Sequence, residues 1–358
     1  MSMKNLNQSC SVYGWDIGGA HLKVCQIRNI KNKDVIRAVQ IKCKLWKGLE
    51  NLSRAIKEVK NNWSIQESDY HFFTMTGEMV DLFPSRSDGV KNILKVLKSI
   101  FGQKVECYSQ DSTFTTLSPK NNWQSIASSN WHVTANFVSS YIKEGVLVDI
   151  GSTTTDLIPI KNSVPITKKN TSDASRLRNG ELVYLGITRT LVSSIKPNLR
   201  FKNYYYNVMR ESFANTADVF RITNELATED DLYPTCDNME KTRLASERRL
   251  ARVIGMDREN ATSKEWRVFA NHIKALIVKE LHKNIKKIVT RLDLNHRSPL
   301  IVTGSGAFLA KQLCMENNYK LVMFHDLVKK EFELKEFQIK EVNVCAPAVS
   351  LAIIASKK

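Results

Sequence analysis

The sequence contains the same short pattern twice, once near the N-terminus and once near the middle. Residues 12–28 (VYGWDIGGAHLKVCQIR) and 144–160 (EGVLVDIGSTTTDLIPI) each place an apolar segment, a glycine-containing turn and a second apolar segment in succession. Aligned on their aspartates, DIGGAHLK (16–23) and DIGSTTTD (149–156) match in length and in their first three residues. Apolar residues on both sides of a tight turn are typical of a β-hairpin. The repeat therefore predicts two domains with the same core, each opening on a hairpin.

Each turn has a composition suited to binding an anion. Consecutive glycines and small residues let backbone N–H groups approach a phosphate without a Cβ in the way. Asp16 and Asp149, which open the turns, can hold a hydrated Mg²⁺ that bridges to phosphate, because Mg²⁺ keeps water ligands and takes one or two carboxylates. A single turn of this kind also occurs for conformational reasons alone. Two matched turns predict a phosphate site with Mg²⁺ as cofactor.

The remaining segments alternate between strand and helix patterns. Apolar residues at helical spacing predict amphipathic helices, and short apolar runs bounded by turns predict strands. Besides the hairpins, the expected strands are 35–45, 70–76, 105–108, 299–303 and 320–323, and the expected helices are 49–60, 89–101, 123–141, 265–292 and 347–355. After the strand at 299–303, a Gly-Ser-Gly turn opens a further helix. The pattern predicts an α/β protein.

The second hairpin suggests the domain limits. A chain of 358 residues is long enough for two domains, and we expect them at residues 1–142 and 143–345. Residues at about 162–260 lack regular periodicity and are expected to form an insertion in the second domain. The small-residue helix at 346–358 is expected to return to the first domain.

The chain is basic, with 53 lysine and arginine residues against 36 aspartate and glutamate residues and a net charge of +17. Such a balance raises affinity for anionic partners, phosphorylated or polycarboxylate substrates included. The cations are spread along the chain and interleaved with acids, with no dense basic run and no RNA-binding signature. We therefore expect a solvated, lysine-rich surface and no nucleic-acid partner.

Cysteine spacing and hydropathy bear on the compartment. The seven cysteines are scattered and never in CxxC spacing, whereas disulfide frameworks and zinc sites need tighter patterns. No apolar stretch approaches the ~20 residues that span a bilayer. The N-terminus (MSMKNLNQSC) has no basic region followed by an apolar one. We expect a cytoplasmic protein with reduced thiols and no membrane partner.

The two hairpins and the later Gly-Ser-Gly element resemble, in this order, the two phosphate motifs and the adenosine motif of the actin/sugar-kinase/Hsp70 superfamily. The resemblance implies two ribonuclease-H-like domains with a central cleft. It also implies the binding residues, which are Asp16, Gly18, Gly19 and Lys23 in the first hairpin, Asp149, Gly151, Ser152, Thr153 and Thr154 in the second, and Gly304, Ser305 and Gly306 at the nucleoside side. His21 departs from the small polar residue common in such turns, which leaves the use of ATP open.

Further segments resemble a single family. They are TMTGEMVDLFPSR (74–86), SNWHVTA (129–135), ELVYLGITRT (181–190) and the stretch at 217–255. On these segments the chain is identified as a member of the hydantoinase/oxoprolinase-like family linked with tetrahydromethanopterin-dependent one-carbon transfer.

The family resemblance implies a transferase of methanofuran or methylofuran biosynthesis with small-molecule substrates. An aminomethylfuran-methyl diphosphate would lose diphosphate while the phenol of γ-glutamyltyramine, or of a tyrosine-like acceptor, forms an aryl ether. Such chemistry asks for donors and a metal at the diphosphate, a base for the phenol and a dry cleft. The hairpins would then hold a leaving group, and ATP need not be a substrate. The oligomeric state stays open, a homo-oligomer included.

The resemblance also implies catalytic residues. Lys23 would contact phosphate. Asp156, which ends the second hairpin, would act as a base or orient a water molecule, with a turn-capping aspartate as the alternative. Glu78 would bind the substrate amine or act as a base, with an exposed loop glutamate as the alternative. His132 would position the phenol, with a structural histidine as the alternative. Further candidates are Arg86 and Arg189 as anion contacts, with ordinary surface arginines as the alternative. Tyr184 would stack on the furan or phenol, with a packed core tyrosine as the alternative.

Two other functions remain open from the sequence. An ATP-dependent small-molecule kinase or an oxoprolinase-like amide hydrolase would use the same fold and hairpins, and substrate-dependent ATP hydrolysis would favour it. A non-catalytic, ATP-gated binding or filament-forming module is the second alternative. Sedimentation with and without nucleotide would identify a filament.

Overall fold

The computed structural model describes residues 10–30, 33–102, 105–116, 123–166 and 172–358. The chain forms two compact units. Unit 1 comprises Met1–Gly145, Ile158–Asp173 and Val322–Lys358, and unit 2 comprises Val146–Leu157 and Ala174–Leu321.

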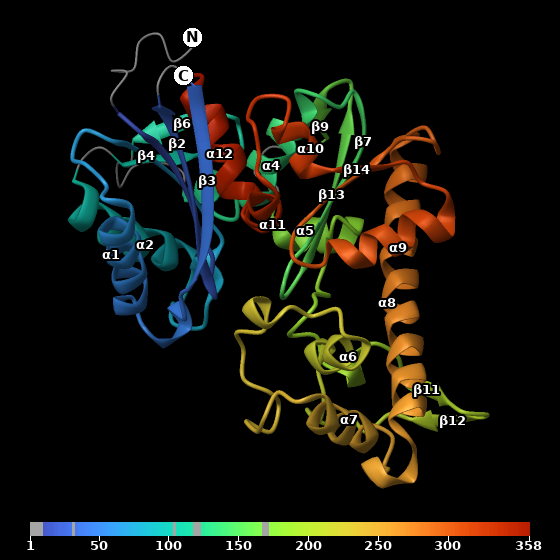
Figure 1. Ribbon diagram of the computed structural model, residues 1–358. Coiled ribbons are helices and arrows are strands. Elements are labelled where there is room, and N and C mark those ends of the chain that lie inside the picture. Colours follow the sequence, from blue (N-terminus) through green and yellow to red (C-terminus); the bar gives the residue numbers. More distant parts are fainter. Residues whose placement is uncertain (1–9, 31–32, 103–104, 117–122, 167–171) are drawn as a thin grey trace. The chain divides into compact units, whose positions relative to one another are not determined.

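The first sheet lies in unit 1 and has six strands in the order β3-β2-β1-β4-β5-β6 (Figure 1). The strands are β1 (Val12–Ile17), β2 (His21–Ile30), β3 (Lys33–Lys42), β4 (Tyr70–Met75), β5 (Val105–Tyr108) and β6 (Phe114–Thr116). β2 runs antiparallel to both β1 and β3, whereas β1, β4 and β5 run parallel to one another. A three-stranded antiparallel meander followed by parallel strands that return through helices is the predicted ribonuclease-H-like arrangement.

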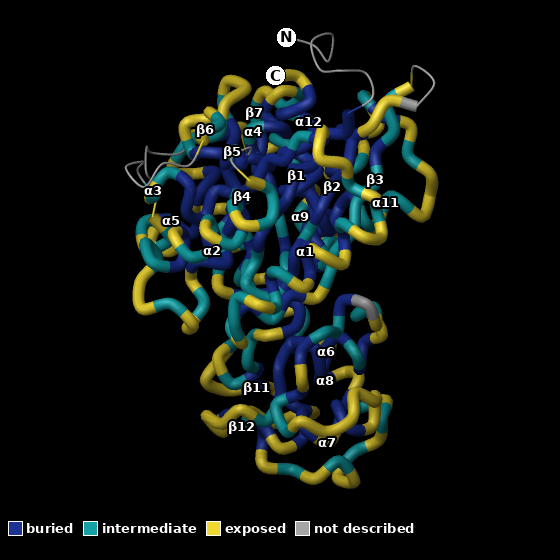
Figure 2. The backbone as a smooth tube through the Cα atoms, turned by 90° about the vertical axis from the view of Figure 1, so that its left-hand side faces the viewer, coloured by how far each residue is buried: buried dark blue, intermediate teal, exposed yellow. Residues whose placement is uncertain are grey.

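Helices pack on both faces of this sheet. The helices of unit 1 are α1 (Glu50–Trp63), α2 (Arg86–Phe101), α3 (Trp123–Ile126), α4 (Asn130–Ser139), α10 (Phe324–Val328), α11 (Glu336–Val344) and α12 (Ala346–Ser356). One core contains Ile56 of α1 and Ile93 of α2, and a second contains Val133 of α4 and Leu351 of α12. Between them β1 is buried along its whole length (Figure 2). The C-terminal helix α12 contacts β1, β2 and β4, which are strands of the predicted first domain.

The helix predicted at residues 123–141 is in fact two helices, α3 and α4. They are separated at Ser128, whose backbone lies in the left-handed region with φ of 48°, where non-glycine residues are uncommon. The Ser128 hydroxyl contacts Glu78 and Arg86, which are distant in sequence. The prediction of one continuous helix is therefore wrong. Apolar periodicity reports only on neighbouring residues, so it could not reveal these contacts with distant ones.

The second sheet has the order β10-β8-β7-β13-β14, with β9 beside β8. Its strands are β7 (Glu144–Ile150), β8 (Thr155–Lys161), β9 (Val164–Pro165), β10 (Leu182–Val183), β13 (Leu300–Thr303) and β14 (Leu321–Met323). Residues 151–154 join β7 to β8, and a connection this short requires an antiparallel pair. β13 then runs parallel to β7, as β4 does to β1 in the first sheet.

The division between the units passes through the second sheet, because β7 and β8 each contribute residues to both units. The division therefore does not decide the predicted domain limits, residues 1–142 and 143–345 with an insertion at about 162–260. Those limits stay a prediction, as does a cleft between the domains.

The other elements follow the second hairpin in the chain. They are α5 (Asp173–Asn179), β11 (Asn198–Phe201), β12 (Tyr204–Asn207), α6 (Thr216–Thr223), α7 (Arg243–Arg252), α8 (Ser263–Leu292) and α9 (Ala307–Asn317), with single 3-10 turns at Leu45–Lys47, Gly77–Met79, Val192–Ser194, Thr228–Asp230 and Arg258–Asn260. α8 is the long helix predicted at 265–292, and it begins at a capping box between Thr262 and Glu265.

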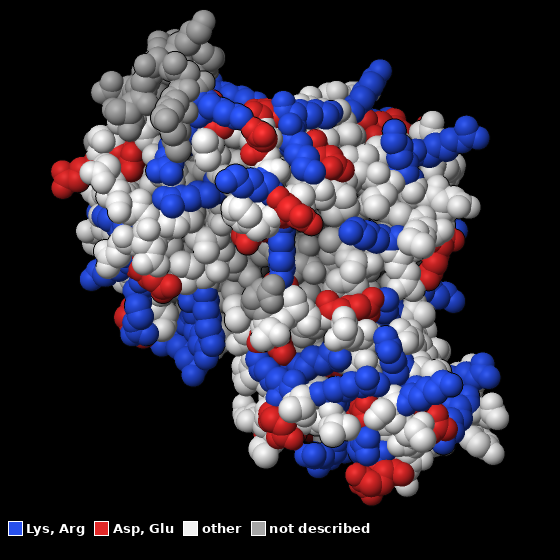
Figure 3. Space-filling view, viewed as in Figure 1, with Lys and Arg blue, Asp and Glu red and all other residues white. Residues whose placement is uncertain are grey.

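Two properties of the surface and the helices bear on partners. On the face shown in Figure 3, lysine and arginine side chains are spread widely and lie among acidic ones. Among the described helices, none alone is long and apolar enough to cross a membrane, although α11 and α12 together, bent by 95°, pass that test of length and composition.

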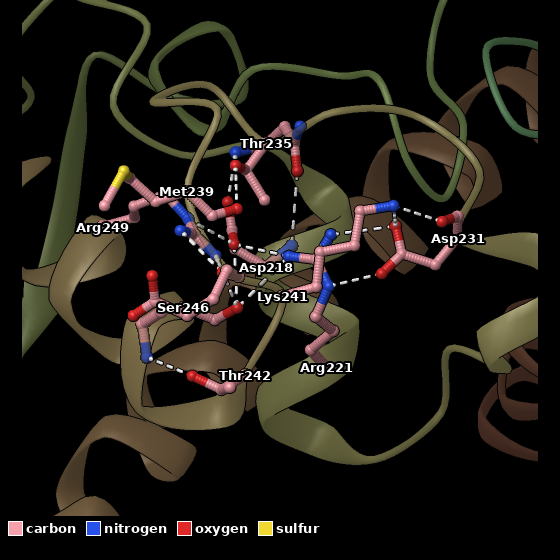
Figure 4. Close-up of polar contacts among 12 residues, drawn as sticks. Asp218, Arg221, Asp231, Thr235, Met239, Lys241, Thr242, Ser246 and Arg249 are labelled. Carbon is pink, nitrogen blue, oxygen red and sulfur yellow. Dashed lines mark hydrogen bonds and ion pairs between the residues drawn. The ribbon is translucent and has the colours of Figure 1, made fainter.

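Buried charges join α6 to α7 in unit 2 (Figure 4). Oδ1 of Asp218 accepts hydrogen bonds from Arg221 at 2.7 Å and from Arg249 at 2.8 Å. Arg249 also donates to Oδ1 of Asp237 at 3.0 Å. Asp218 and Arg249 are 0% and 1% exposed, so the two charges are compensated by each other rather than by water.

Removal of one partner from this network should destabilise unit 2. Arg249→Met leaves Asp218 buried with less compensation, and we expect the free energy of unfolding to fall by about 3–5 kcal/mol. The matched control is Arg248→Met, because Arg248 is half-exposed and lies 3.8 Å from Glu240; its loss should cost less than about 1 kcal/mol. Urea denaturation measures both, and equal losses would contradict the assigned role of the network.

Candidate functional site

The first hairpin turn is fixed through its carbonyl groups. The N–H of Leu45 donates to the carbonyl oxygen of Gly19 at 3.0 Å, and the N–H of Cys43 donates to that of Ala20 at 2.9 Å. The segment that follows β3 therefore supports the turn from one side. The carbonyl of Ile17, at the base of the turn, accepts from the N–H of Thr76 at 2.9 Å.

The second turn is fixed in the same way. The N–H of Ile187 donates to the carbonyl oxygen of Gly151 at 3.1 Å, and that of Thr188 donates to the carbonyl oxygen of Ser152 at 3.1 Å. Ile187 and Thr188 follow β10, which is the third strand of its meander as β3 is of the first. The family-like segment ELVYLGITRT thus contains both a strand and the support of the second turn.

Engaged carbonyls orient the N–H groups of the turns. In a trans peptide the C=O of one residue and the N–H of the next point in opposite directions. The N–H groups of Ala20, Ser152 and Thr153 therefore point away from the supporting segments. Among the described residues, neither the backbone N–H nor the hydroxyl of Ser152, Thr153 or Thr154 makes a hydrogen bond. Donors grouped in this way can bind an anion.

Close approach of the backbone at Gly186 holds the second turn in place. A Cβ at Gly186 would lie 2.5 Å from the carbonyl group of Ser152 and from the nitrogen of Thr153. Real Cβ atoms do not approach a backbone this closely, so only glycine fits.

The predicted Gly-Ser-Gly turn lies against the same hairpin. The N–H of Gly306 donates to the carbonyl oxygen of Ile150 at 2.8 Å. Gly304 has a positive φ of 84°, and a Cβ there would lie 2.5 Å from Oδ1 of Asp149. Unit 2 therefore brings Asp149, the second turn and residues 304–306 together.

The two predicted metal ligands are the aspartates at the ends of β1 and β7. Asp16 is 2% exposed, and its Oδ2 lies 3.9 Å from Nζ of Lys23 across the hairpin. Asp149 is half-buried beside Gly304. Among the described residues, no three His, Cys, Asp or Glu side chains are grouped as a metal site. One carboxylate per turn suits Mg²⁺, which takes one or two carboxylates and completes its shell with water and phosphate oxygens.

Asp156 is paired with an arginine that the sequence did not indicate. Its Oδ1 accepts a hydrogen bond of 2.5 Å from Arg176, which is 2% exposed and also donates to the carbonyl oxygen of Glu181 at 3.2 Å. The pair fixes the carboxylate at the end of the second hairpin. Such a contact fits the alternative of a structural aspartate, and the role of Asp156 as a base stays a prediction.

Glu78 is buried rather than an exposed loop residue. Its Oε1 accepts hydrogen bonds from Ser128 at 2.8 Å and from Arg86 at 3.1 Å. NH1 of Arg86 also lies 3.8 Å from Asp173. Burial raises the pKa of the Glu78 carboxyl above its ordinary value, against the opposing effects of Ser128 and Arg86.

Burial lowers the pKa of both His132 and His21. His132 is 5% exposed, and its Nδ1 lies 3.0 Å from the hydroxyl of Tyr108. Burial lowers the pKa of His132 to about 4. Burial, followed by Lys23 and Lys42, lowers the pKa of His21 to about 3. Among the described hydrogen bonds, none joins His132 to either turn, and its role with the phenol stays a prediction.

The other candidates lie at the surface. Arg189 is exposed, and its guanidinium carbon lies 4.9 Å from the centre of the Tyr233 ring. Tyr184 is 65% exposed, so the alternative of a packed core tyrosine is wrong.

Sequence reasoning missed four residues that support the candidates. Gly186 lies in a family-like segment and Ser128 directly precedes one. The signals that could have identified them are a glycine within a strand–loop pattern and a serine before a helix. Asp173 and Arg176 lie in a polar segment (TSDASRLRNG) without a pattern. Only tertiary structure brings these two to Arg86 and Asp156, respectively.

The Gly186 contact predicts a loss of anion binding. Gly186→Ala should displace Ser152 and Thr153 and weaken the binding of magnesium diphosphate by about tenfold or more, equivalent to about 1.4 kcal/mol. The control is Gly14→Ala, where a Cβ would lie 2.2 Å from the carbonyl oxygen of Ala348 in unit 1. Both variants are overpacked and should lose about 1–3 kcal/mol of stability, but Gly14→Ala should keep its affinity in calorimetric titration. Equal affinity in both variants would sink the assignment.

The depressed pKa of His132 predicts acid sensitivity. The folded state favours the neutral imidazole of His132. The contribution of His132 to the free energy of unfolding is therefore complete above pH 6.5, the pKa of an unperturbed histidine, and is lost as the pH falls toward about 4. The slope is about 1.4 kcal/mol per pH unit for one proton. His132→Gln should therefore flatten the decline in unfolding free energy between these limits. The exposed His296→Gln is the control, and parallel curves for all three proteins would contradict the expectation.

The chain is similar in sequence to one protein family and to two proteins of known name. Residues 50–331 match the hydantoinase/oxoprolinase family. The chain is 31% identical over 349 residues to the (4-{4-[2-(gamma-L-glutamylamino)ethyl]phenoxymethyl}furan-2-yl)methanamine synthase of Methanocaldococcus jannaschii, covering 97% of this chain and 98% of that protein. It is 29% identical over 225 residues to the protein of the same name from Methanococcus vannielii, covering 62% of this chain and 95% of that one.

A solved structure supports the fold. The nucleotide-free structure of acetone carboxylase matches with a TM-score of 0.55 and 10% identity, covering 95% of this chain and 70% of that chain. With the strand orders of the two sheets, the predicted actin/sugar-kinase/Hsp70 fold is confirmed. The match over residues 50–331 and the 31% identity over nearly the whole chain confirm the predicted family: the chain belongs to the hydantoinase/oxoprolinase family.

Proposed function

We propose that this protein is a transferase of methanofuran-type cofactor biosynthesis. It condenses an aminomethylfuran-methyl diphosphate with the phenol of γ-glutamyltyramine or of a tyrosine-like acceptor. The carbon–oxygen bond to the diphosphate breaks, the phenol oxygen bonds to the furan methylene carbon, and the phenol proton leaves to a base or to water. The products are an aryl ether and diphosphate.

The observation that carries this proposal is the 31% identity to the Methanocaldococcus jannaschii synthase over 97% of this chain. The name of that protein describes a phenoxymethyl-furan methanamine, which contains the ether bond that the proposed condensation forms. The match covers 97% of this chain, and the 3% outside it, about 11 residues, is too short to exclude the first turn at 16–23 or the second at 149–156.

The turns offer the chemistry that a departing diphosphate needs. Donors aimed at developing negative charge stabilise a transition state more than a ground state. The N–H groups and hydroxyls of residues 152–154 are such donors, and Lys23 adds a positive charge beside the first turn. Asp16 and Asp149 would each bind Mg²⁺ at its own turn, and the metal would neutralise charge on a diphosphate bound there. The proposal also places the reaction in the cytoplasm.

The test is reconstitution from purified components. We expect the protein to form the ether from the furan diphosphate and γ-glutamyltyramine, with stoichiometric diphosphate and without ATP, detected by mass spectrometry and a diphosphate assay. Tyramine and tyrosine, offered as parallel acceptors, would define the acceptor. Diphosphate release without ether would refute the transferase, and substrate-dependent ATP hydrolysis would support a kinase or amide hydrolase instead.

A variant connects the activity to the second turn. Asp149→Asn should lower kcat/KM by about 100-fold, the order seen when one stabilising group of a transition state is lost. Asp326→Asn makes the same chemical change at an exposed aspartate and should retain activity. Unchanged activity in Asp149→Asn would show that Asp149 does not act in the reaction.

A further inference from the structure

Glu78 is a buried carboxylate with an incomplete set of hydrogen bonds. The residue is 1% exposed, and its two described donors, Ser128 and Arg86, both bond to Oε1. Among the described residues, Oε2 has no hydrogen-bond partner. Most buried polar atoms in native proteins are satisfied, and an exception needs an explanation. A ligand that donates a hydrogen bond to Oε2 would supply one.

The positive charge beside Glu78 is shared. NH2 of Arg86 lies 3.1 Å from Glu78, while NH1 lies 3.8 Å from Asp173. The guanidinium of Arg86 thus forms ion pairs with two carboxylates, those of Glu78 and Asp173. The pKa of Glu78 remains raised by burial even with Arg86 and Ser128 beside it, so these neighbours do not fully stabilise the ionised form. A further cation would stabilise it.

The contacts of the cluster hold Ser128 in an unfavourable backbone conformation. Ser128 has a φ of 48°, and its hydroxyl donates to Glu78 at 2.8 Å while accepting from Arg86 at 2.8 Å. The next residue, Ser129, is tied to Thr74 of β4 at 2.8 Å. Conformations of this kind persist where the surroundings enforce them, and they occur often at binding sites.

Glu78 is held next to the first turn. The N–H of Thr76 bonds to the carbonyl of Ile17, and a Cβ at Gly77 would lie 3.3 Å from the carbonyl oxygen of Gly18. On the other side, a Cβ at Gly89 of α2 would lie 2.5 Å from the carbonyl oxygen of Glu78. The backbone of Glu78 is therefore fixed between the turn and α2, all within unit 1.

We propose that the cluster of Glu78, Arg86, Ser128 and Asp173 binds the primary ammonium group of the furan diphosphate substrate. The ammonium donates to Oε2 of Glu78 and brings a positive charge next to that carboxylate. This inference rests on the proposed function, because it takes the substrate from there. It adds which end of that substrate unit 1 recognises and through which residues.

Two other ligand groups fit the cluster less well. A phenol hydroxyl could donate to Oε2 but would bring no positive charge. The α-ammonium of an amino acid or glutamyl acceptor comes with a carboxylate, and Arg86, the cation of the cluster, is already engaged by Glu78 and Asp173. An aminomethyl group presents an ammonium with no neighbouring carboxylate.

The test compares two ligands and two proteins. The affinities of the aminomethylfuran-methyl diphosphate and of its analogue with methyl in place of aminomethyl are measured by calorimetry with magnesium and without acceptor. We expect Glu78→Gln to weaken binding of the amine-bearing compound by about 30-fold and to change that of the analogue by less than about threefold. Glu58→Gln, the same change on the exposed side of α1, should alter neither.

A second variant, Asp173→Asn, tests the proposal if Glu78→Gln does not fold. Asp173 lies nearer the surface, with 15% of its side chain exposed, and Asp173→Asn should weaken only the amine-bearing ligand, by about five- to tenfold. Equal affinities of both ligands in wild type, or equal losses of both in the variants, would overturn the ammonium site.

Further outcomes separate this inference from the proposed function. Failure of the wild type to bind either diphosphate would count against the proposed function itself. If Glu78→Gln spares donor binding but lowers kcat with the phenol, Glu78 is a base and the inference is wrong. If the variant changes discrimination between γ-glutamyltyramine and tyramine instead, the cluster binds the acceptor, which also overturns it.

Discussion

The tie between each turn and the segment after its third strand is the interaction on which the candidate site depends. In unit 1 the segment at Cys43–Leu45 holds the turn carbonyls, and in unit 2 the segment at Ile187–Thr188 does so. A glycine-rich turn without such support would sample many conformations, because glycine restricts the backbone least. With the carbonyls engaged, the planar peptide leaves the N–H groups directed to the other side. The proposed anion site therefore depends on the meander of three strands as much as on the turn sequence.

Local patterns made the hairpins, most strands and the long helix predictable. DIGGAHLK and DIGSTTTD carry their turn and flanking apolar residues within eight positions each, and α8 shows its apolar face over many turns. These elements need no information from distant parts of the chain. The supporting segments were harder to identify, since Cys43, Leu45 and Ile187 look like ordinary apolar residues. Their function in the fold comes from backbone N–H groups, which every sequence position has.

The remaining parts of the site depend on contacts between distant residues. Ser128 breaks a helix that its own neighbours favour, because its hydroxyl bonds to Glu78 and Arg86. Arg176 is buried against Asp156, although arginine is usually exposed. No periodicity marks either residue as special. A single sequence gives the residue types of such contacts without their partners, and the pairing appears only once the sheets are assembled.

Two buried carboxylates in this chain show how structure can separate a packing role from a binding role. Asp218 receives hydrogen bonds on both oxygens, from Arg221 and Arg249 on Oδ1 and from the N–H of Asn215 on Oδ2. Glu78 is buried to the same degree but receives donors on one oxygen alone among the described residues. A fully satisfied buried network rigidifies a fold, whereas an incomplete one costs free energy that the fold alone does not recover. That difference assigns Asp218 to the scaffold and is the basis for the proposal that a ligand completes the hydrogen bonding of Glu78.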